Sequence, residues 1–194
     1  NLMIQMDPSL GEQAKEEPLK LASVSPGDIA LVTISPGIGF SRIFASLGAA
    51  AIVEGGQTMN PSTQEILGAF EDLPTDHVII LPNNKNILMA AKSAAELSVK
   101  QVEVIPTVTV PQGLAAILRL IPGQSLEQVS KEMLSAMKEI ESGEITTAVR
   151  DVEIDGIDDK EGEIITLLNG NLVGSSKTLE DGCLTFLESA KVED

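Results

Sequence analysis

The stretch that decides the fold is "DIALVTISPGIGFSRIFASLG", residues 28–48. It opens with "DIALVTIS", a short and nearly continuous apolar run, which is typical of a strand buried on both faces. The turn residues "PGIG" follow, and "FSRIFASLG" then has the apolar spacing of a helix that ends at Gly48. The stretch is therefore predicted to form a strand–loop–helix unit.

The same unit recurs three times further along the chain. Strands are predicted in "AAAIVE", "HVIIL" and "QVEVIP", and the matching helices in "TQEILGAF", "ILMAAKSAAEL" and "GLAAILRL". Buried strands that alternate with helices indicate an α/β fold, in which helices cover a parallel sheet. We assign residues 28–194 to a single α/β domain with its parallel core in 28–120, and residues 1–27 to a linker or partly ordered extension.

The pattern changes after residue 120. "SLEQVSKEMLSAMKEIESG" opens with a Ser cap and predicts a long amphipathic helix. Its apolar positions are Leu126, Val129, Met133, Met137 and Ile140. "GEIITLL" and "NLVGSS" are joined at Asn169 and Gly170, a strong two-residue hairpin signal, and a terminal helix is predicted over Leu179 to Ala190. We expect an antiparallel appendage that packs on the parallel sheet or extends it.

The loops that follow the predicted parallel strands are polar and contain glycine. In such a sheet these loops lie together at one edge, where ligands bind. Capping and turn formation account for any one loop about as well as binding does, but four such loops at one edge favour a binding surface. The candidate partner- or ligand-binding residues are Gly37, Gly39, Gly55, Gly56, Gln57, Thr58, Asn60, Asn83, Asn84, Asn86 and Gln112.

Composition excludes several classes of function. Twenty-nine acidic and 13 basic residues give a net charge of -16, which opposes nucleic-acid binding, and the absence of Trp and Tyr removes base-stacking residues. No apolar run approaches the ~20 residues that span a bilayer. We therefore expect neither a nucleic-acid partner nor a membrane-spanning segment. Cys183 is the one cysteine, which favours a cytoplasmic protein, and its helical context predicts a small buried side chain.

Three motifs resemble known sites without completing them. "GIGFSR" with Glu54 imitates a dinucleotide fingerprint, but Arg42 stands where the third glycine belongs. "DVEIDGIDDKEGE" resembles a calcium loop, but Glu153 and Gly162 occupy ligand positions, so a solvated hairpin is the better interpretation. His77 is predicted at the edge opposite the polar loops. The sequence therefore predicts a binding domain with no catalytic residue and no metal site.

Longer runs carry a resemblance to a known family. "LGAAAIVEGGQTMNPSTQEIL", "HVIILPNNKNILMAA", "VIPTVTVPQGLAAIL" and "AVRDVEIDG" resemble the C-terminal domain of the dihydroxyacetone-kinase-like family. Its characterised members are the large subunit of bacterial fatty acid kinase. The resemblance covers residues 28–194 and departs in the first loop, where family members often have acidic residues and this chain has Ile38 and Arg42.

The resemblance implies a DegV-like α/β fold and a non-catalytic role. In such kinases a separate domain binds the nucleotide, and a DegV-type small subunit presents a fatty acid whose carboxylate is phosphorylated with ATP. ATP and Mg²⁺ are therefore expected only in that kinase domain, and no cofactor is expected in this chain. Because the chain does not begin with Met, we expect it to be part of a longer polypeptide. The expected partners are a DegV-type fatty-acid-binding protein and other domains of the parent chain, with a homodimer left open.

Two classes of function compete for the loops. They form either a protein-docking surface or a small-molecule site, in which backbone N–H groups at helix starts hold a phosphate, carboxylate or dinucleotide. Only Lys85 and Arg42 supply basic side chains there, which is little support for an anion site. The residues expected to contact an acyl-binding small subunit are Gln57, Thr58, Asn60, Asn83, Asn84 and Gln112.

Overall fold

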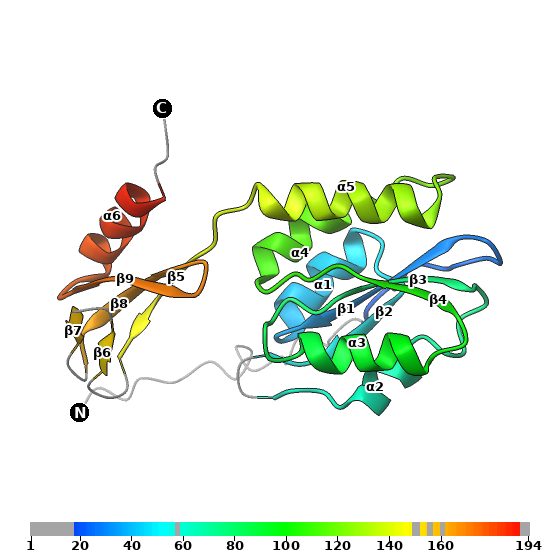
Figure 1. The fold of residues 1–194 in the computed structure, drawn as a ribbon, viewed down its shortest axis with the longest axis horizontal. Coiled ribbons are helices and arrows are strands. Elements are labelled where there is room, and N and C mark those ends of the chain that lie inside the picture. Colours follow the sequence, from blue (N-terminus) through cyan, green and yellow to red (C-terminus); the bar gives the residue numbers. More distant parts are fainter. Residues whose placement is uncertain (1–17, 57–58, 149–151, 155–156, 160–161, 191–194) are drawn as a thin grey trace, which may run out of the picture.

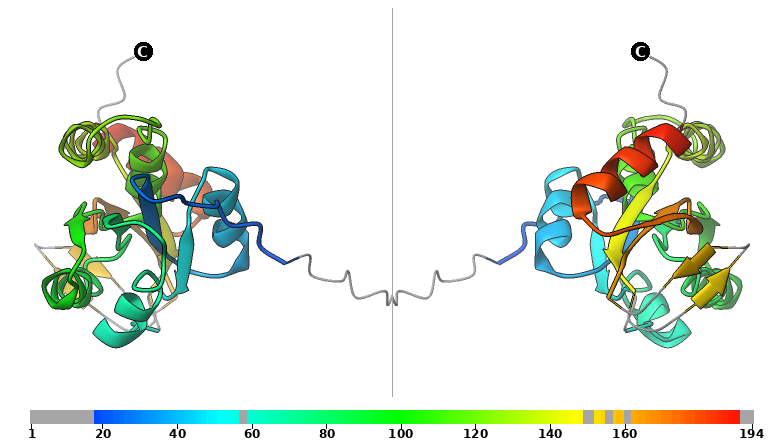
Figure 2. Two further views of the ribbon diagram at one scale, coloured as in Figure 1. Left: turned by 90° about the vertical axis from the view of Figure 1, so that its right-hand side faces the viewer. Right: turned by 90° about the vertical axis from the view of Figure 1, so that its left-hand side faces the viewer.

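The computed structural model describes residues 18–56, 59–148, 152–154, 157–159 and 162–190. Two parts lie next to each other along the long axis of the molecule (Figure 1), and end-on views show one behind the other (Figure 2). We call residues 29–138 the parallel part and residues 143–189 the antiparallel part. Within the described ranges, none of the helices combines the length and apolar character needed to cross a bilayer.

The parallel part contains a four-stranded sheet with the strand order β2-β1-β3-β4, and each neighbouring pair is parallel. Its elements are β1 (Ile29–Ser35), α1 (Ile38–Ser46), β2 (Ala51–Glu54), α2 (Thr63–Gly68), β3 (His77–Leu81), α3 (Leu88–Leu97), β4 (Gln101–Val104), α4 (Val110–Ile117) and α5 (Leu126–Lys138). The predicted α/β fold, with helices covering a parallel sheet of successive strand–helix units, is confirmed.

Helices cover both faces of the parallel sheet, which explains the continuous apolar runs of its central strands. Val32 of β1 and Ile80 of β3 are buried in a cluster with α2 and α3. Leu31 and Ile79, one residue away in each strand, are buried in a second cluster with α1, α4 and α5. Successive residues of a strand point to opposite faces of the sheet. Since helices cover both faces, neither side of β1 or β3 faces solvent, and their sequences need no alternation of polar and apolar residues.

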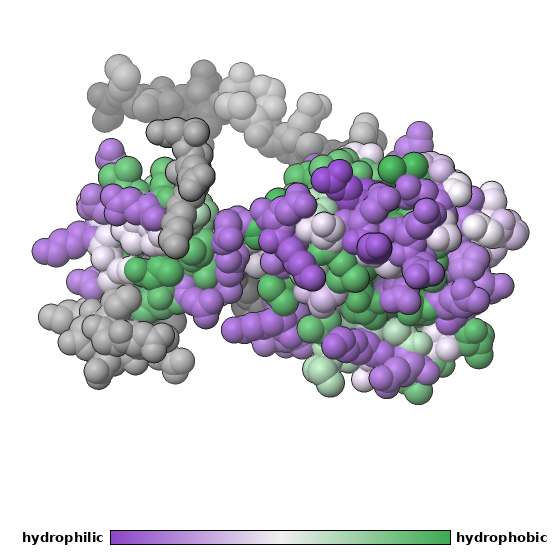
Figure 3. Space-filling model, turned by 45° about the horizontal axis from the view of Figure 1, so that its top comes forward, coloured by the Kyte–Doolittle hydropathy of each residue, from purple (hydrophilic) through white to green (hydrophobic). Residues whose placement is uncertain are grey.

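Helix α5 follows residue 120 in the chain but packs with the parallel sheet. Ser125 caps it by accepting a hydrogen bond from the Gln128 N–H at 3.3 Å. The residues of α5 buried in the second cluster are Val129, Met133 and Met137, in agreement with the predicted amphipathic spacing. The outer surface of α5 is mostly hydrophilic (Figure 3). The chain therefore passes from one part to the other after Lys138, in residues 139–142.

The antiparallel part forms sheets of its own and does not extend the parallel sheet. Its elements are β5 (Gly143–Thr147), β6 (Val152–Ile154), β7 (Ile157–Asp159), β8 (Ile164–Leu168), β9 (Asn171–Ser176) and α6 (Leu179–Ser189). The order β5-β8-β9 gives a three-stranded sheet, and β6 pairs with β7. The predicted hairpin is confirmed, with Asn169 at φ 53° and Gly170 at φ 80°. The calcium-like stretch contains the antiparallel β6–β7 pair, and residues 155–156 between these strands lie outside the described residues.

The structure corrects two local predictions. Helix α4 begins at Val110, three residues earlier than the predicted "GLAAILRL", because Thr109 caps it and Pro111 fits the first helical turn. Cys183 is exposed, although its sequence context predicts a buried side chain. Gly182 is the buried residue of α6, and the helix turns Cys183 away from the sheet.

A capping box fixes the start of α2, and its carboxylate makes a contribution to the stability of the fold that depends on pH. The backbone N–H of Ser62 donates to Glu65 Oε2 at 2.7 Å, and the Glu65 N–H donates to Ser62 Oγ at 3.2 Å. The backbone hydrogen bond from Ser62, with a further one from its hydroxyl, lowers the pKa of Glu65. A carboxylate with a lowered folded-state pKa stabilises the fold above its unfolded pKa, and this stabilisation is lost as the pH falls through the folded pKa.

We therefore expect Glu65→Gln to lower the melting temperature near neutral pH and to converge with the wild type in acid. Thermal melts from about pH 7 down to about pH 3 measure the difference, which should shrink as the pH falls below the ordinary Glu pKa of about 4.3. Glu71→Gln, at an exposed position just after the same helix, is the matched control. A difference that stays constant over the whole pH range would contradict this role of the carboxylate.

Candidate functional site

The loops after the parallel strands meet where the strand order changes direction. β1 and β3 lie side by side, and the chain leaves β1 towards β2 but leaves β3 towards β4. Such a change of direction opens a crevice at the carboxyl ends of the strands, which is the usual ligand position in open α/β sheets. We call this region the loop edge, and it consists of residues 36–37, 55–56, 59–62, 82–87 and 105–109.

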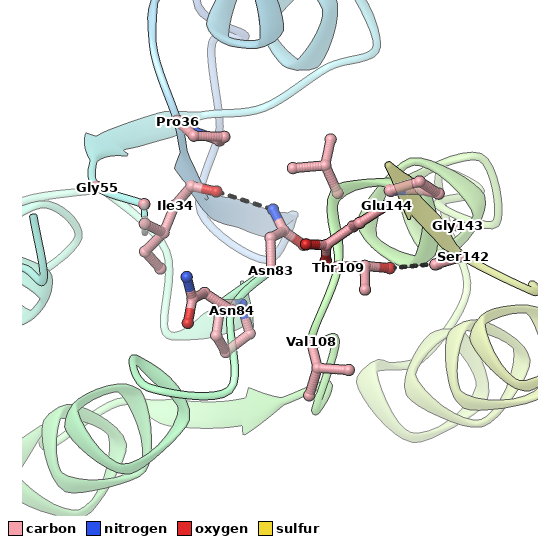
Figure 4. A pocket seen from close by; sticks show the side chains of 14 residues that line it. Ile34, Pro36, Gly55, Asn83, Asn84, Val108, Thr109, Ser142, Gly143 and Glu144 are labelled. Atoms are coloured by element: carbon pink, nitrogen blue, oxygen red, sulfur yellow. Dashed lines mark hydrogen bonds between the residues drawn. The ribbon is translucent and has the colours of Figure 1, made fainter. Parts of the chain in front are cut away.

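Asn83 bridges the crevice as an internal crosslink (Figure 4). It has φ 56°, a left-handed conformation that Asn tolerates better than most residues, and its exposed fraction is only 7%. Its Nδ2 donates to Thr33 Oγ1 at 2.9 Å and to the Ile34 carbonyl at 2.8 Å. The Thr107 hydroxyl donates to Asn83 Oδ1 at 2.8 Å and accepts from the Asn83 N–H at 3.1 Å. The amide that the sequence predicts to contact a partner is thus used inside the protein.

Gly113 makes room for this crosslink. A Cβ at Gly113 would lie 2.0 Å from Asn83 Oδ1 and 2.7 Å from Asn83 Cγ. Sequence reasoning did not single out Gly113, Thr33 or Thr107 as site residues. Asn83 lies 50 residues from Thr33 and 24 from Thr107 along the chain, so no local pattern signals the contact.

Gly55 and Gly56 are required by close packing and not by a left-handed backbone conformation. Neither has a positive φ. A Cβ at Gly55 would lie 2.6 Å from Pro61 Cδ, and a Cβ at Gly56 would lie 2.8 Å from Pro36 Cβ. Gly37, by contrast, has φ 91° and stands just before α1.

The remaining predicted residues are spread over the loop edge and the helices that follow it. Gln112 Oε1 accepts from the Val108 N–H at 2.9 Å, and Asn84 Oδ1 accepts from the Asn86 N–H at 2.8 Å. These side chains therefore shape their own loops. Gly39 in α1, Asn60 and Asn86 are exposed, and Gln57 and Thr58 lie outside the described residues.

Helix capping accounts for part of the polar character of the loops. Ser62 and Thr109 cap α2 and α4 with their side chains. Helices α1 and α3 begin without a side-chain cap and without an acidic residue in the first turn. Their first N–H groups are the feature on which the alternative small-molecule site depends.

A pocket of about 200 Å³ opens beside Asn83 (Figure 4). It is lined by Ile34, Pro36, Gly55, Gly56, Pro82, Asn83, Asn84, Val108, Thr109, Val110, Pro111, Ser142, Gly143 and Glu144. The structure therefore brings together four of the predicted residues, Gly55, Gly56, Asn83 and Asn84. Gly37, Gly39, Asn60, Asn86 and Gln112 are not part of its lining.

One wall of the pocket comes from the antiparallel part. The hydroxyl groups of Thr109 and of Ser142, the residue just before β5, form a buried hydrogen bond at 2.6 Å. The Ser142 N–H donates to Asn169 Oδ1 at 2.9 Å, and the Asn169 N–H donates to the Ser142 carbonyl at 2.7 Å. The β8–β9 turn thus holds Ser142 in position, and Ser142 in turn holds the wall against α4.

The charges around the pocket are sparse. Glu144 is the one ionisable side chain among the lining residues. Arg42 in α1 and Lys85 in the loop after β3 are exposed and lie outside the lining. His77 starts β3 at the opposite edge of the sheet, as predicted. In the part of the chain that the structure describes, no group of three or more His, Cys, Asp or Glu residues is placed to hold a metal ion.

Comparison with known proteins identifies relatives of the chain. The family model for the C-terminal region of FakA-like fatty acid kinase subunits matches residues 30–194. The chain is 48% identical over 164 residues to Protein YloV of Bacillus subtilis (strain 168), covering 84% of this chain and 30% of YloV. It is 40% identical over 180 residues to a protein of Staphylococcus aureus (strain USA300), covering 93% of this chain and 33% of that protein. The chain thus spans about a third of the length of these relatives.

Proposed function

The chain belongs to the FakA-like C-terminal family of fatty acid kinase subunits, which confirms the family predicted from the sequence, and from this premise we propose its function. We propose that it is the non-catalytic C-terminal domain of a fatty acid kinase large subunit. In this proposal the domain engages a DegV-type acyl-binding partner, so that ATP phosphorylates the fatty acid carboxylate in a separate kinase domain. ATP and Mg²⁺ belong to that domain, outside this chain.

Exposed apolar side chains in the loop edge and in the first turns of the helices that follow it are the observation that carries the proposal. Ile38 in the first turn of α1 is 47% exposed, Met59 after β2 is 55% exposed, and Met89 in the first turn of α3 is 69% exposed. All three follow the carboxyl ends of parallel strands, and the loop edge also carries the exposed amides of Asn60 and Asn86. Apolar side chains mixed with amides suit protein contact, because they gain from burial and an amide avoids the desolvation cost of a charge.

We expect Met89→Ala to weaken binding of the full 194-residue chain to a DegV-type protein of the same organism about three- to tenfold. Biolayer interferometry measures the dissociation constant, and thermal melts check folding. Leu97→Ala is a matched control, because Leu97 is 64% exposed at the other end of the same helix. Equal losses for both variants would place the contact elsewhere on α3, and failure of the wild type to bind any DegV-type protein would refute the proposed function.

The alternative is a small-molecule site at the uncapped starts of α1 and α3. Calorimetry of the chain with Mg-ATP and with inorganic phosphate tests it. We expect no binding of Mg-ATP tighter than a dissociation constant of about 10 µM, which corresponds to roughly -7 kcal/mol. Tighter binding would favour the alternative over the docking surface.

A further inference from the structure

Resting on this proposed function, we infer that the pocket beside Asn83 is an anchor site for the DegV-type partner. It receives one aromatic or branched aliphatic side chain from a surface loop of that protein. The inference depends on the size of the pocket, its walls, its position and its charge.

The pocket has the size of a single apolar side chain. Its volume of about 200 Å³ exceeds the ~150 Å³ of an apolar cavity that accepts benzene. It is smaller than the ~300–1,000 Å³ typical of sites for drug-sized ligands. A side chain of the size of Phe or Leu therefore fits better than a nucleotide, a dinucleotide or an acyl chain.

Much of the wall is apolar, and it is already in place without the partner. Pro36, Val108 and Pro111 supply apolar surface, and the packing that excludes a Cβ at Gly55 and Gly56 fixes the wall beside them. Asn83 holds the ends of β1 and β3 together through its hydrogen bonds. A preformed pocket loses little conformational freedom on binding, which favours an anchor contact.

The pocket also lies where a docking surface would be centred. Residues that follow each of the four parallel strands line it, together with the start of β5. The exposed Met59 lies beside it, since its carbonyl accepts from the N–H of Gly56 at 2.8 Å. Anchor residues of protein interfaces are usually buried near the centre of the contact and surrounded by weaker contacts.

The charge of the pocket lining argues against an anionic occupant. The lining contains Glu144 and no Lys, Arg or His, and the chain as a whole carries a net charge of -16. A phosphate or carboxylate entering the pocket would meet no opposite charge there. An apolar side chain avoids this cost, because it brings no charge into the pocket.

The first test replaces a lining residue with a larger side chain that fills the pocket. Val108→Phe places a ring at the lining, and Val99→Phe makes the same substitution at a residue that is 95% exposed, in the connection between α3 and β4. We expect Val108→Phe to weaken binding to the DegV-type partner at least about tenfold, whereas Val99→Phe binds like the wild type. Both variants are compared by interferometry, with melting temperatures to confirm folding.

A measurement without the partner tests the pocket itself. Benzyl alcohol is titrated into the wild type and both Val variants, and amide chemical shifts are followed. We expect saturable shifts at Gly55, Gly56 and Gly143 in the wild type and in Val99→Phe, and none in Val108→Phe. No saturable shift in the wild type would overturn the anchor site, even if Val108→Phe failed to fold.

The outcomes separate the inference from the proposed function. If the wild type binds a DegV-type protein and folded Val108→Phe binds equally well, the anchor site is wrong and the proposed function stands. If the wild type binds none of these proteins, both are refuted. Loss of binding in Val108→Phe together with loss of the benzyl alcohol shifts supports the inference.

Discussion

Replacing Gly113 with Ala is expected to destabilise the protein by about 3 kcal/mol or more, because the new methyl group occupies the space of the Asn83 side chain. A Cβ at Gly113 would lie 2.0 Å from Asn83 Oδ1, a distance that no small adjustment relieves. Moving the amide away breaks its bonds to Thr33 and Ile34 and leaves buried polar groups without partners. Chemical denaturation of the 194-residue chain measures the free energy of unfolding.

The same substitution at another helical glycine provides the control. A Cβ at Gly39 in α1 would have no atom within 4 Å, so Gly39→Ala should be neutral or stabilise by up to about 1 kcal/mol. Asn83→Ala removes the amide with which the new methyl group at position 113 would collide. The cost of Gly113→Ala should therefore become small in the Asn83→Ala background. Additive costs of the two substitutions would contradict the proposed reason for the glycine.

Replacing Gly55 with Val is expected to cost about 2–4 kcal/mol, the second large effect. The Cβ alone would lie 2.6 Å from Pro61 Cδ and 3.0 Å from Ile34 Cγ2, and Val adds two further methyl groups. Pro61 is buried and its ring is stiff, so the strain is relieved only by shifting the loop after β2. Thermal and chemical denaturation measure the loss.

Gly68→Val is the control for this variant, because a Cβ at Gly68 meets no atom within 4 Å. It should change the free energy of unfolding by no more than about a few tenths of a kcal/mol, since Val and Gly differ little at a helix end. If Gly55→Val melted like the wild type, Gly55 would be only a spacer in the loop.

The parts of the fold that could be predicted are those with a local cause. The apolar runs of β1 and β3 indicate strands because both faces of these strands are buried. Asn169 and Gly170 indicate a hairpin because both adopt positive φ, which few other residue pairs allow. The capping of α5 by Ser125 is equally local.

The number of sheets could not be predicted. The alternation of apolar and polar residues along a strand indicates which of its faces is buried, but not which other strand it pairs with. The antiparallel strands therefore gave no sign that they form a separate sheet. The exposure of Cys183 has a similar cause. Apolar residues lie on both sides of α6, and the side that packs is chosen by the fit of Gly182 against Ile145 and Ile164 of the sheet, 3.2 Å from where its Cβ would be.

The gathering of polar loops at one edge of the sheet could be predicted from the sequence, but the contacts of their side chains could not. The polar loops that follow the parallel strands gather at one edge, and Gly55, Gly56, Asn83 and Asn84 line a pocket there. Their roles depend on residues far away in the sequence. Asn83 is satisfied by Thr33 and Thr107, and the pocket is closed by Ser142, none of which a local pattern connects with the loops.

The Asn83 crosslink also bears on how long the site persists once formed. Its hydrogen bonds join segments 24 to 50 residues apart, so they are gained only after β1, β3 and the loop beyond β4 have come together. Interactions completed late in folding leave the folding rate almost unchanged and mainly slow unfolding. Asn83 therefore governs the lifetime of the assembled loop edge more than the speed with which it assembles.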